Sequence, residues 1–312
     1  MVGVPPREPM LRPGLLVTRR DDRTLQVGLE PRRRVGLPDA PEMRAALKAL
    51  ATGALADDPD LAASEAAAEA VRRLVAADLL VDRRALVAAL AHPDPTDPLA
   101  QSGVAAAFAQ HGASAPDRLA TRAAASVSVR LLGSDRLLDV WAREVTGLLR
   151  RSGMRSVVLG DDTATTVALV LSAGEPDRDL LDGALATGQP HLLLTVVEGV
   201  VRLGPFVDPG LTACVRCVDA HLDERDDRRA VVVRQHADAG PDPTGLPRPA
   251  DPALVAMALA WAARDLVSFV DGDPPSTRSA TVSLEPDLTL ARHHWRRHPH
   301  CGCCWGDLLD VV

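Results

Sequence analysis

All five cysteines lie in the last third of this 312-residue chain, in two tight clusters. Cys214 and Cys217 form a C-x-x-C pair, and Cys301, Cys303 and Cys304 form the second cluster. Structural zinc prefers thiolate ligands, and a C-x-x-C turn directs two sulfurs at one point. The pattern therefore predicts one tetrahedral Zn²⁺ site that joins the clusters. Four sulfur ligands leave no open coordination position, so we expect the metal to stabilise the fold rather than to catalyse a reaction.

Five cysteines exceed the four ligands that zinc needs, so the residues alone leave several arrangements open. Cys303 and Cys304 could form a redox-active pair, or one of them could be a buried apolar side chain. A histidine could also replace a cysteine. The candidates near the second cluster are His293, His294, His298 and His300.

The bulk composition limits the partners and the location. The net charge is −7 at pH 7 and the sequence pI is about 5.7, whereas nucleic-acid binding needs a cationic face. We therefore expect no nucleic-acid partner. No apolar run approaches the roughly 20 residues that span a bilayer, and residues 1–14 lack the apolar core of a secretory signal. These patterns, together with clustered cysteines, favour a cytoplasmic protein without a membrane partner.

The elements that must position these residues fall into two blocks. The first block, residues 1–91, has short strand-like runs separated by turn residues and followed by helical patterns. The strands are expected at 15–18, 24–30 and 32–37, and the helices at 41–50 and 64–77. A small antiparallel sheet followed by helices is typical of a winged-helix module. Residues 92–100 contain three prolines and no periodicity, which predicts a linker.

In the second block, residues 101–312, strands alternate with helices, which predicts an α/β domain with right-handed crossovers and a mainly parallel, Rossmann-like sheet. The strands are expected at 126–133, 154–160, 167–174, 191–197 and 199–207, and a final antiparallel pair at 279–286 and 289–295. The helices are expected at 136–151, 177–188 and 252–270.

The stretch GPFVDPGLTACVRC (204–217) resembles the segment that ends the core of ThiF/MoeB-type, ubiquitin-activating-like adenylating enzymes. In that family a strand leads into a P-G-x-x-x-C-x-x-C zinc half-site, and HPHCGCC (298–304) is similar to its second half-site. The resemblance covers roughly residues 120–305. The C-x-x-C spacing of the active enzymes favours Cys304 as the fourth ligand, whereas the HPxCGC pattern of the inactive relatives favours Cys303.

Active members of that family place a Gly-rich turn after the first strand, and its backbone amides hold the ATP phosphates at a helix N-terminus. Here the turn reads GSDRLL (133–138), with one glycine left and Asp135 where the phosphate would approach. Asp161 or Asp162 could still contact a ribose. No cysteine precedes Cys214 to carry a thioester. The resemblance therefore implies a pseudo-enzyme that binds no ATP and catalyses no adenylation.

A degenerate domain of this type behind a winged-helix module resembles the ThiF-like partner proteins of YcaO cyclodehydratases in thiazole/oxazole-modified microcin biosynthesis. Residues 12–37 and the helices after them are similar to the PqqD-like RiPP recognition element. The resemblance implies that a precursor leader peptide adds as a strand at 32–37, beside the helix of 64–77. The candidate contacts are Arg32, Arg33, Arg34, Val35 and Arg72, and the arginines would favour an acidic leader. The plainer interpretation of these arginines is a charged edge that prevents aggregation.

Two other functions stay open at this stage. One is an ATP-dependent adenylating enzyme with a divergent nucleotide site, against which the degraded turn argues. The other is a winged-helix DNA-binding regulator. Against it, the helix of 64–77 offers only Arg72 and Arg73 as cations, beside two glutamates. The family resemblance also implies a homodimer, for which the Ala-rich helix of 252–270, with Trp261, offers a packing surface.

Overall fold

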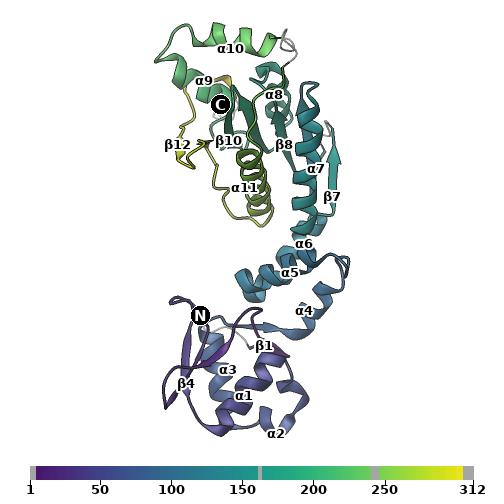
Figure 1. The fold of residues 1–312 in the computed structure, drawn as a ribbon, viewed down its shortest axis with the longest axis vertical. Helices are drawn as coiled ribbons and strands as arrows, with labels where there is room; N and C mark the ends of the chain where they lie inside the picture. The colour runs from purple at the N-terminus through teal and green to yellow at the C-terminus, as the bar shows by residue number, and fades with distance from the viewer. Residues whose placement is uncertain (1–4, 161–163, 240–245, 305–312) are drawn as a thin grey trace, which may run out of the picture. The chain divides into compact units, whose positions relative to one another are not determined.

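The computed structural model describes residues 5–160, 164–239 and 246–304, and of Cys304 it describes the backbone alone. The chain divides into two compact units, residues 1–120 and 121–312, each with its own hydrophobic core (Figure 1). The segment 92–100, predicted as a linker, lies inside unit 1. There Asp97 Oδ1 accepts hydrogen bonds from the backbone N–H groups of Leu99 and Ala100 and caps a helix that begins at Pro98.

Unit 1 contains two small antiparallel sheets, one with strand order β2-β3-β4 and one that pairs β1 with β5. The strands are β1 (Pro9–Leu11), β2 (Val17–Arg19), β3 (Thr24–Val27), β4 (Val35–Pro38) and β5 (Leu80–Asp82). The helices are α1 (Pro41–Thr52), α2 (Pro59–Ala62), α3 (Glu65–Ala76), α4 (Arg83–Leu90), α5 (Pro98–His111) and α6 (Ala115–Ala124), the last of which continues into unit 2. The sheet order confirms the predicted meander.

The third strand of that meander begins at Val35 and not at Arg32. The Arg33 N–H donates to Glu30 O over 2.8 Å, which closes a turn just before β4. Side chains of β3, β4, α1 and α3 form the core, in which Val27, Leu37 and Leu74 are fully or almost fully buried.

Unit 2 is built on one seven-stranded sheet with the order β12-β11-β10-β9-β8-β6-β7. Its strands are β6 (Ser126–Leu132), β7 (Ser156–Leu159), β8 (Val167–Ser172), β9 (His191–Val197), β10 (Val200–Val207), β11 (Ala280–Leu284) and β12 (Leu290–His294). Its helices are α7 (Arg136–Arg151), α8 (Arg178–Ala186), α9 (Val215–Asp223), α10 (Arg229–Asp238) and α11 (Pro252–Val270).

Strands β7, β6, β8 and β9 are parallel, whereas β10, β11 and β12 continue the sheet in antiparallel pairs. The parallel half is the predicted Rossmann-like part, and the final pair at the C-terminal edge is antiparallel as expected. The sheet as a whole is mixed. Strand order reverses at β6, since β7 and β8 lie on its two sides, and ligands of open α/β sheets bind at such a switch point.

Helices α7 and α11 cover one face of this sheet and bury the main core with Trp141, Val145 and Leu259 (Figure 1). Helices α8 and α9 lie on the other face, where Leu181 and Val215 contact the strands. The two faces therefore differ, because the α8–α9 face holds only a small apolar cluster and leaves part of the sheet accessible.

Helix α11 is long and apolar enough, by length and composition, to cross a membrane, with a mean hydropathy of 1.7. No apolar run of this length was expected from the sequence, and Arg264 and Asp265 lie within the helix. In the fold, 56% of its apolar window is buried against the sheet and α7. Asp265 is 2% exposed and accepts hydrogen bonds from Ser276 N at 2.8 Å and Thr277 N at 2.9 Å. These contacts are those of a core helix.

Candidate functional site

The two cysteine clusters meet at the N-terminus of α9. Cys214 is the residue before α9 and Cys217 lies in its first turn, while Cys301 and Cys303 come from the segment around the 3-10 helix Gly302–Cys304. The Sγ–Sγ distances are 3.7 Å for Cys214–Cys217, 3.5 Å for Cys214–Cys301 and 3.4 Å for Cys217–Cys303, and all four atoms lie within 4.8 Å of one another. Sulfurs around a tetrahedral zinc ion lie about 3.8 Å apart, given a Zn–S bond of about 2.3 Å. The four sulfurs therefore fit zinc.

The surroundings of these sulfurs favour deprotonation of one of them. Cys214, Cys217 and Cys301 are buried, at 1%, 0% and 5% exposure. The pKa of Cys217 is lowered to about 4 because the Cys214 S–H donates to its sulfur, and the backbone N–H of His298 adds a second hydrogen bond at 3.3 Å. The pKa of Cys214 is raised because it is the donor in that pair and because it is buried. Four thiolates this close repel one another, so a divalent cation is the ligand that suits this donor set.

Cys303 supplies the fourth sulfur of this group, and the side chain of Cys304 lies outside the described residues. None of the histidines considered as replacement ligands joins the sulfur group among the residues that the structure describes. His293 and His294 lie on β12, and the His300 N–H donates to His298 Nδ1 over 3.2 Å. The sulfurs alone therefore complete the set.

His298 also belongs to a neighbouring group of metal-ligand type with His221 and Glu224. Ring nitrogens of both histidines in this group already take part in hydrogen bonds within the protein. His221 Nε2 lies 3.0 Å from Arg296 O, and His298 Nε2 lies 3.0 Å from Glu224 Oε1. The hydrogen bond from His298 holds the pKa of Glu224 below its usual value. These contacts fix the segment that carries Cys301 and Cys303 against α9.

The turn after β6 places a carboxylate at the N-terminus of α7. Asp135 is the N-cap residue, and its Oδ1 accepts the Leu137 N–H at 2.9 Å. Its Oδ2 lies 3.2 Å from Nε of Arg248, and the Arg248 guanidinium also lies against Gly174 in the loop after β8. The chain's own ion pair therefore joins the N-terminus of α7 to a residue that lies against the loop after β8. The candidate ribose contacts, Asp161 and Asp162, lie outside the described residues.

The predicted peptide-contacting residues surround β4 and α3, which contact each other. Val35 is the first residue of β4, and the arginines before it lie in the turn. Arg33 Nη1 donates to Ala109 O over 3.0 Å, whereas Arg32 and Arg34 are exposed and form no ion pair with any residue in the described ranges. Arg72 is exposed on α3 and forms an ion pair with Glu69.

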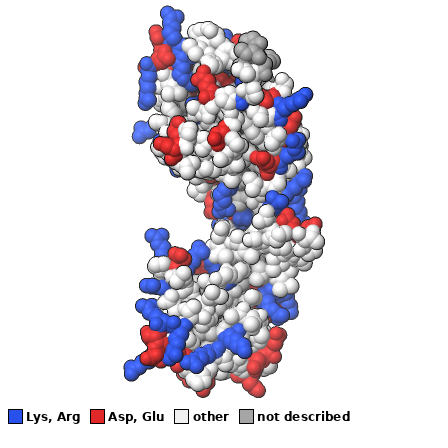
Figure 2. Space-filling view, in the orientation of Figure 1, with Lys and Arg blue, Asp and Glu red and all other residues white. Residues whose placement is uncertain are grey.

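Helix α3 also carries a shallow apolar cavity of about 350 Å³, and Arg72 stands in its wall. The other lining residues are Pro5, Ala62, Ala67, Ala68, Val71 and Val75. The face of the molecule drawn in Figure 2 shows cationic and anionic side chains interspersed over unit 1 rather than one continuous cationic surface. The cavity combines an apolar floor with a nearby guanidinium.

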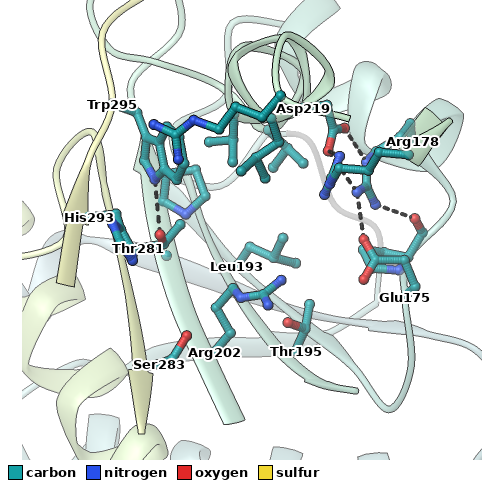
Figure 3. Close-up of a pocket in the computed structure, with 18 residues that line it drawn as sticks. Glu175, Arg178, Leu193, Thr195, Arg202, Asp219, Thr281, Ser283, His293 and Trp295 are labelled. Atoms are coloured by element: carbon teal, nitrogen blue, oxygen red, sulfur yellow. Dashed lines mark hydrogen bonds and ion pairs between the residues drawn. The ribbon is translucent and has the colours of Figure 1, made fainter. Parts of the chain in front are cut away.

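Sequence reasoning gave no role to a pocket of about 300 Å³ on the α8–α9 face of the sheet (Figure 3). Thr195 of β9, Arg202 of β10 and Ser283 of β11 lie next to one another in register there. The available signal was Arg202, which is the single charged residue of VVRLGPFV (200–207). An arginine in the middle of an apolar strand is unusual unless its charge has a partner.

No protein-family profile and no curated protein matches the sequence. Solved structures match its fold. A heterocyclase in complex with substrate and cofactor matches with a TM-score of 0.67 and 20% identity, over 95% of this chain and 39% of that protein. The heterocyclase TruD matches with a TM-score of 0.66 and 20% identity, over 95% and 42%. MccB from E. coli, solved with succinimide, matches with a TM-score of 0.59 and 12% identity, over 95% and 99%.

The chain thus spans about two fifths of the length of the two heterocyclases and nearly the whole of MccB. At these identities the matches show a shared fold over 95% of this chain. They agree with the Rossmann-like α/β architecture of unit 2.

Proposed function

We propose that this chain is a non-catalytic scaffold of ribosomal-peptide (RiPP) biosynthesis that binds the leader of a precursor peptide and presents it to a YcaO-type cyclodehydratase. The observation that carries the proposal is the unpaired edge of β4. Within the described residues β4 bonds to β3 on one side only. An extended peptide can add to such an edge through main-chain hydrogen bonds. In this proposal unit 1 is a winged-helix module of the RiPP-recognition type.

The side chains around β4 suit an acidic, partly apolar peptide. Arg32 and Arg34 stand free at the start of the strand, so they can pair with carboxylates of the leader. The apolar cavity on α3 offers a place for one or two apolar side chains of the same peptide. The charges of Arg32 and Arg34 would mainly raise the association rate of the peptide, and the apolar cavity would increase its affinity.

The similar structures support a peptide as the ligand. One of them is described as the microcin C7 biosynthetic enzyme MccB in complex with N-formylated MccA, and another is a heterocyclase in complex with substrate and cofactor. The part of the heterocyclases without a counterpart here amounts to more than half of their length. We assign the cyclodehydration step to the YcaO-type partner.

Two features support a scaffold over an enzyme. Asp135 occupies the N-terminus of α7 with a carboxylate, which would repel a phosphate at the place where a nucleotide binds in folds of this kind. The cysteines form a closed sulfur set that suits structural zinc and leaves no thiol of that set for a thioester. One MccB structure is described as containing ATP, so adenylation is the alternative that the experiments must separate.

The proposal also includes a cytoplasmic homodimer. Helix α11 can contribute to a dimer only with its outer side, for example Met257, which is 42% exposed, because the rest of it packs in the core. Light scattering after size exclusion would give the mass of the particle directly. A monomer at micromolar concentration would remove the dimer but leave peptide binding untouched.

Calorimetry with synthetic leaders of precursor peptides encoded beside this gene tests the proposal. We expect a 1:1 complex that weakens with salt, and about tenfold weaker binding when Arg32→Glu and Arg34→Glu are combined. The matched control is Arg23→Glu, which reverses an exposed charge in the turn between β2 and β3. If no cognate leader binds, or if the control weakens binding as much as the double variant, the leader-binding role is wrong.

Nucleotide chemistry is tested separately. A scaffold should give no ATP–pyrophosphate exchange in the presence of a precursor peptide, whereas an adenylating enzyme should give exchange that depends on the peptide's carboxyl terminus. A gel shift on promoter DNA at physiological salt would instead support the DNA-binding regulator.

A further inference from the structure

The outer face of helix α7 carries a row of arginines at heptad spacing. Arg136, Arg143 and Arg150 recur every seven positions, and Val140 and Gly147 lie between them. Because an α-helix has about 3.6 residues per turn, these five positions, which form the α7 stripe, share an arc of about 80° on one side of the helix. The opposite side of α7 packs into the main core. Figure 2 shows cationic side chains along the side of unit 2 where Figure 1 places α7.

The arginines of the α7 stripe are free to bind a partner. All three are exposed, and none forms an ion pair or a side-chain hydrogen bond with any residue in the described ranges. Asp139 and Glu144 are also exposed and flank the stripe on its two sides, but neither forms an ion pair within the part of the chain that the structure describes. By contrast, the exposed Arg216 on α9 pairs with Asp182. The stripe therefore presents three cations that the chain itself does not neutralise.

Gly147 opens a gap in the middle of the stripe. Glycine is a poor helix former, so packing or backbone conformation commonly accounts for it inside a long helix. Neither does so here, because a Cβ atom at Gly147 would meet no described atom beyond its own turns of helix within 4 Å, and its φ is not in the left-handed region. A helix position without a side chain lets another segment approach the backbone closely. The gap lies between Arg143 and Arg150.

The spacing of the charges favours a helix as the partner. At a rise of about 1.5 Å per residue, consecutive arginines of the stripe lie about 10.5 Å apart along the helix axis. Carboxylates seven positions apart on a second helix repeat at the same distance, whereas side chains on one face of an extended strand repeat at about 6.6 Å. A nucleic acid would bring further phosphates against Asp139 and Glu144 and against a chain with a net charge of −7.

We infer that the α7 stripe docks an acidic α-helix of a partner protein. Carboxylates of that helix, at heptad spacing, pair with Arg136, Arg143 and Arg150, and its apolar side chains between them contact Val140. At Gly147 the two helix axes come closest, toward the lower end of the usual separation of about 8–10 Å. The surface belongs to unit 2, so the inference stands whether or not β4 binds a leader. If the arginines served solubility alone, the stripe would not distinguish between acidic peptides of equal charge.

Nuclear magnetic resonance of the full ¹⁵N-labelled chain tests this surface. The reporters are the backbone amide signals of Val140 and Gly147, and Gly147→Ala identifies the second. The first probe is a capped peptide of three Glu-Ala-Ala-Leu-Ala-Gln-Gln repeats, which places glutamates at heptad spacing on an Ala-rich helix. The second has the same composition with its glutamates adjacent at the amino end, and the third has lysine in place of glutamate. We expect both reporters to shift and saturate with the first peptide, with about tenfold or weaker binding of the second and none of the third.

Two variants separate charge from shape. Arg143→Glu should weaken binding of the heptad peptide by about tenfold or more. Gly147→Leu keeps all three arginines but fills the gap, so binding followed through Val140 should weaken by about tenfold, and Gly147→Ala should have a smaller effect. The matched control is Arg264→Glu on the exposed side of α11, which should bind like the parent. Unchanged signals elsewhere in the spectrum show that each variant is folded.

Three results would overturn the inference. The first is equal affinity for the two glutamate peptides, or no saturable shift with either of them. The second is unchanged binding in either Arg143→Glu or Gly147→Leu. The third is tighter binding of a short DNA duplex than of the heptad peptide, which would assign the stripe to nucleic acid.

Discussion

Replacing Cys217 with serine removes one ligand from the sulfur set and should destabilise unit 2 alone. Cys217 contacts two other sulfurs, at 3.7 Å and 3.4 Å, and the backbone N–H of His298, so its loss leaves an incomplete coordination shell. Structural zinc sites contribute about 10–16 kcal/mol in small domains. One of four ligands then accounts for about 2.5–4 kcal/mol. In a unit of this size the melting temperature should fall by roughly 5–16 °C.

Tryptophan fluorescence is a selective assay for this effect. All four tryptophans lie in unit 2 and none in unit 1, so fluorescence follows the unfolding of unit 2, whereas far-ultraviolet circular dichroism follows both units. We expect the Cys217→Ser fluorescence transition to move to lower temperature while the unit 1 contribution to the dichroism transition does not move. Metal analysis of the purified protein should give one zinc per chain for the parent and less for the variant.

The choice between Cys303 and Cys304 supplies the matched control. Because Cys303 Sγ lies in the sulfur group, Cys303→Ser should lose zinc and stability, and Cys304→Ser should retain both. Zinc-free soluble parent protein that melts at the same temperature as Cys217→Ser would refute the metal site. Zinc loss in Cys304→Ser with retention in Cys303→Ser would reverse the ligand assignment.

Three further predictions concern unit 2. Asp271→Ala removes one partner of the buried pair in which Arg122 Nε donates to Asp271 Oδ1 over 2.7 Å. Urea unfolding should show a loss of about 3–5 kcal/mol, since the Arg122 charge stays buried and unpaired. Asp135→Ala removes the cap on Leu137 N–H and should cost about 1 kcal/mol in the same assay. The pKa of His191 is lowered by burial below its ordinary 6.5, so the unfolded chain binds this proton more readily. The corresponding stability is fully present above about pH 6.5 and is lost as pH falls through the lowered folded-state pKa. His191→Gln should therefore lose less stability than the parent between pH 7 and pH 5. An equal pH slope in both proteins contradicts this reasoning, because metal loss at low pH affects both alike.

The strands of the parallel half could be predicted because each is rich in Val and Leu and lies between segments of turn residues. The three-residue strands β1 and β5 could not. Their pairing joins Pro9 to Asp82, and neither segment has a period or a turn signal of its own. A helix was expected to begin near residue 101, and it begins three residues earlier, at Pro98, because that residue was interpreted as one of three linker prolines rather than as the first turn of a helix.

The residues of the candidate sites also divide into those that a local sequence pattern identifies and those that only the tertiary structure brings together. The C-x-x-C pair is a local pattern, so Cys214 and Cys217 were identifiable from spacing, and Asp135 was visible in the degraded turn. Arg248 was not, because its contact with Asp135 depends on how the segment before α11 crosses the sheet. The polar surroundings of Arg202 could not be predicted, because only the strand register places Thr195 and Ser283 beside it. A single sequence does not specify that register.

The sulfur site has a consequence for the order of synthesis. Cys301 is translated 87 positions after Cys214, so at 5–20 residues per second the first pair of thiols waits roughly 4 to 17 seconds for the second. During that interval the ribosome-bound chain carries an open dithiol that is available to oxidants and to stray metal ions. Unit 2 can close only when its last segment arrives, whereas unit 1 can fold first. The metal can therefore bind all four sulfurs only at the end of synthesis. Zinc shortage during growth should lead to the accumulation of chains in which unit 1 is folded and unit 2 is incompletely folded.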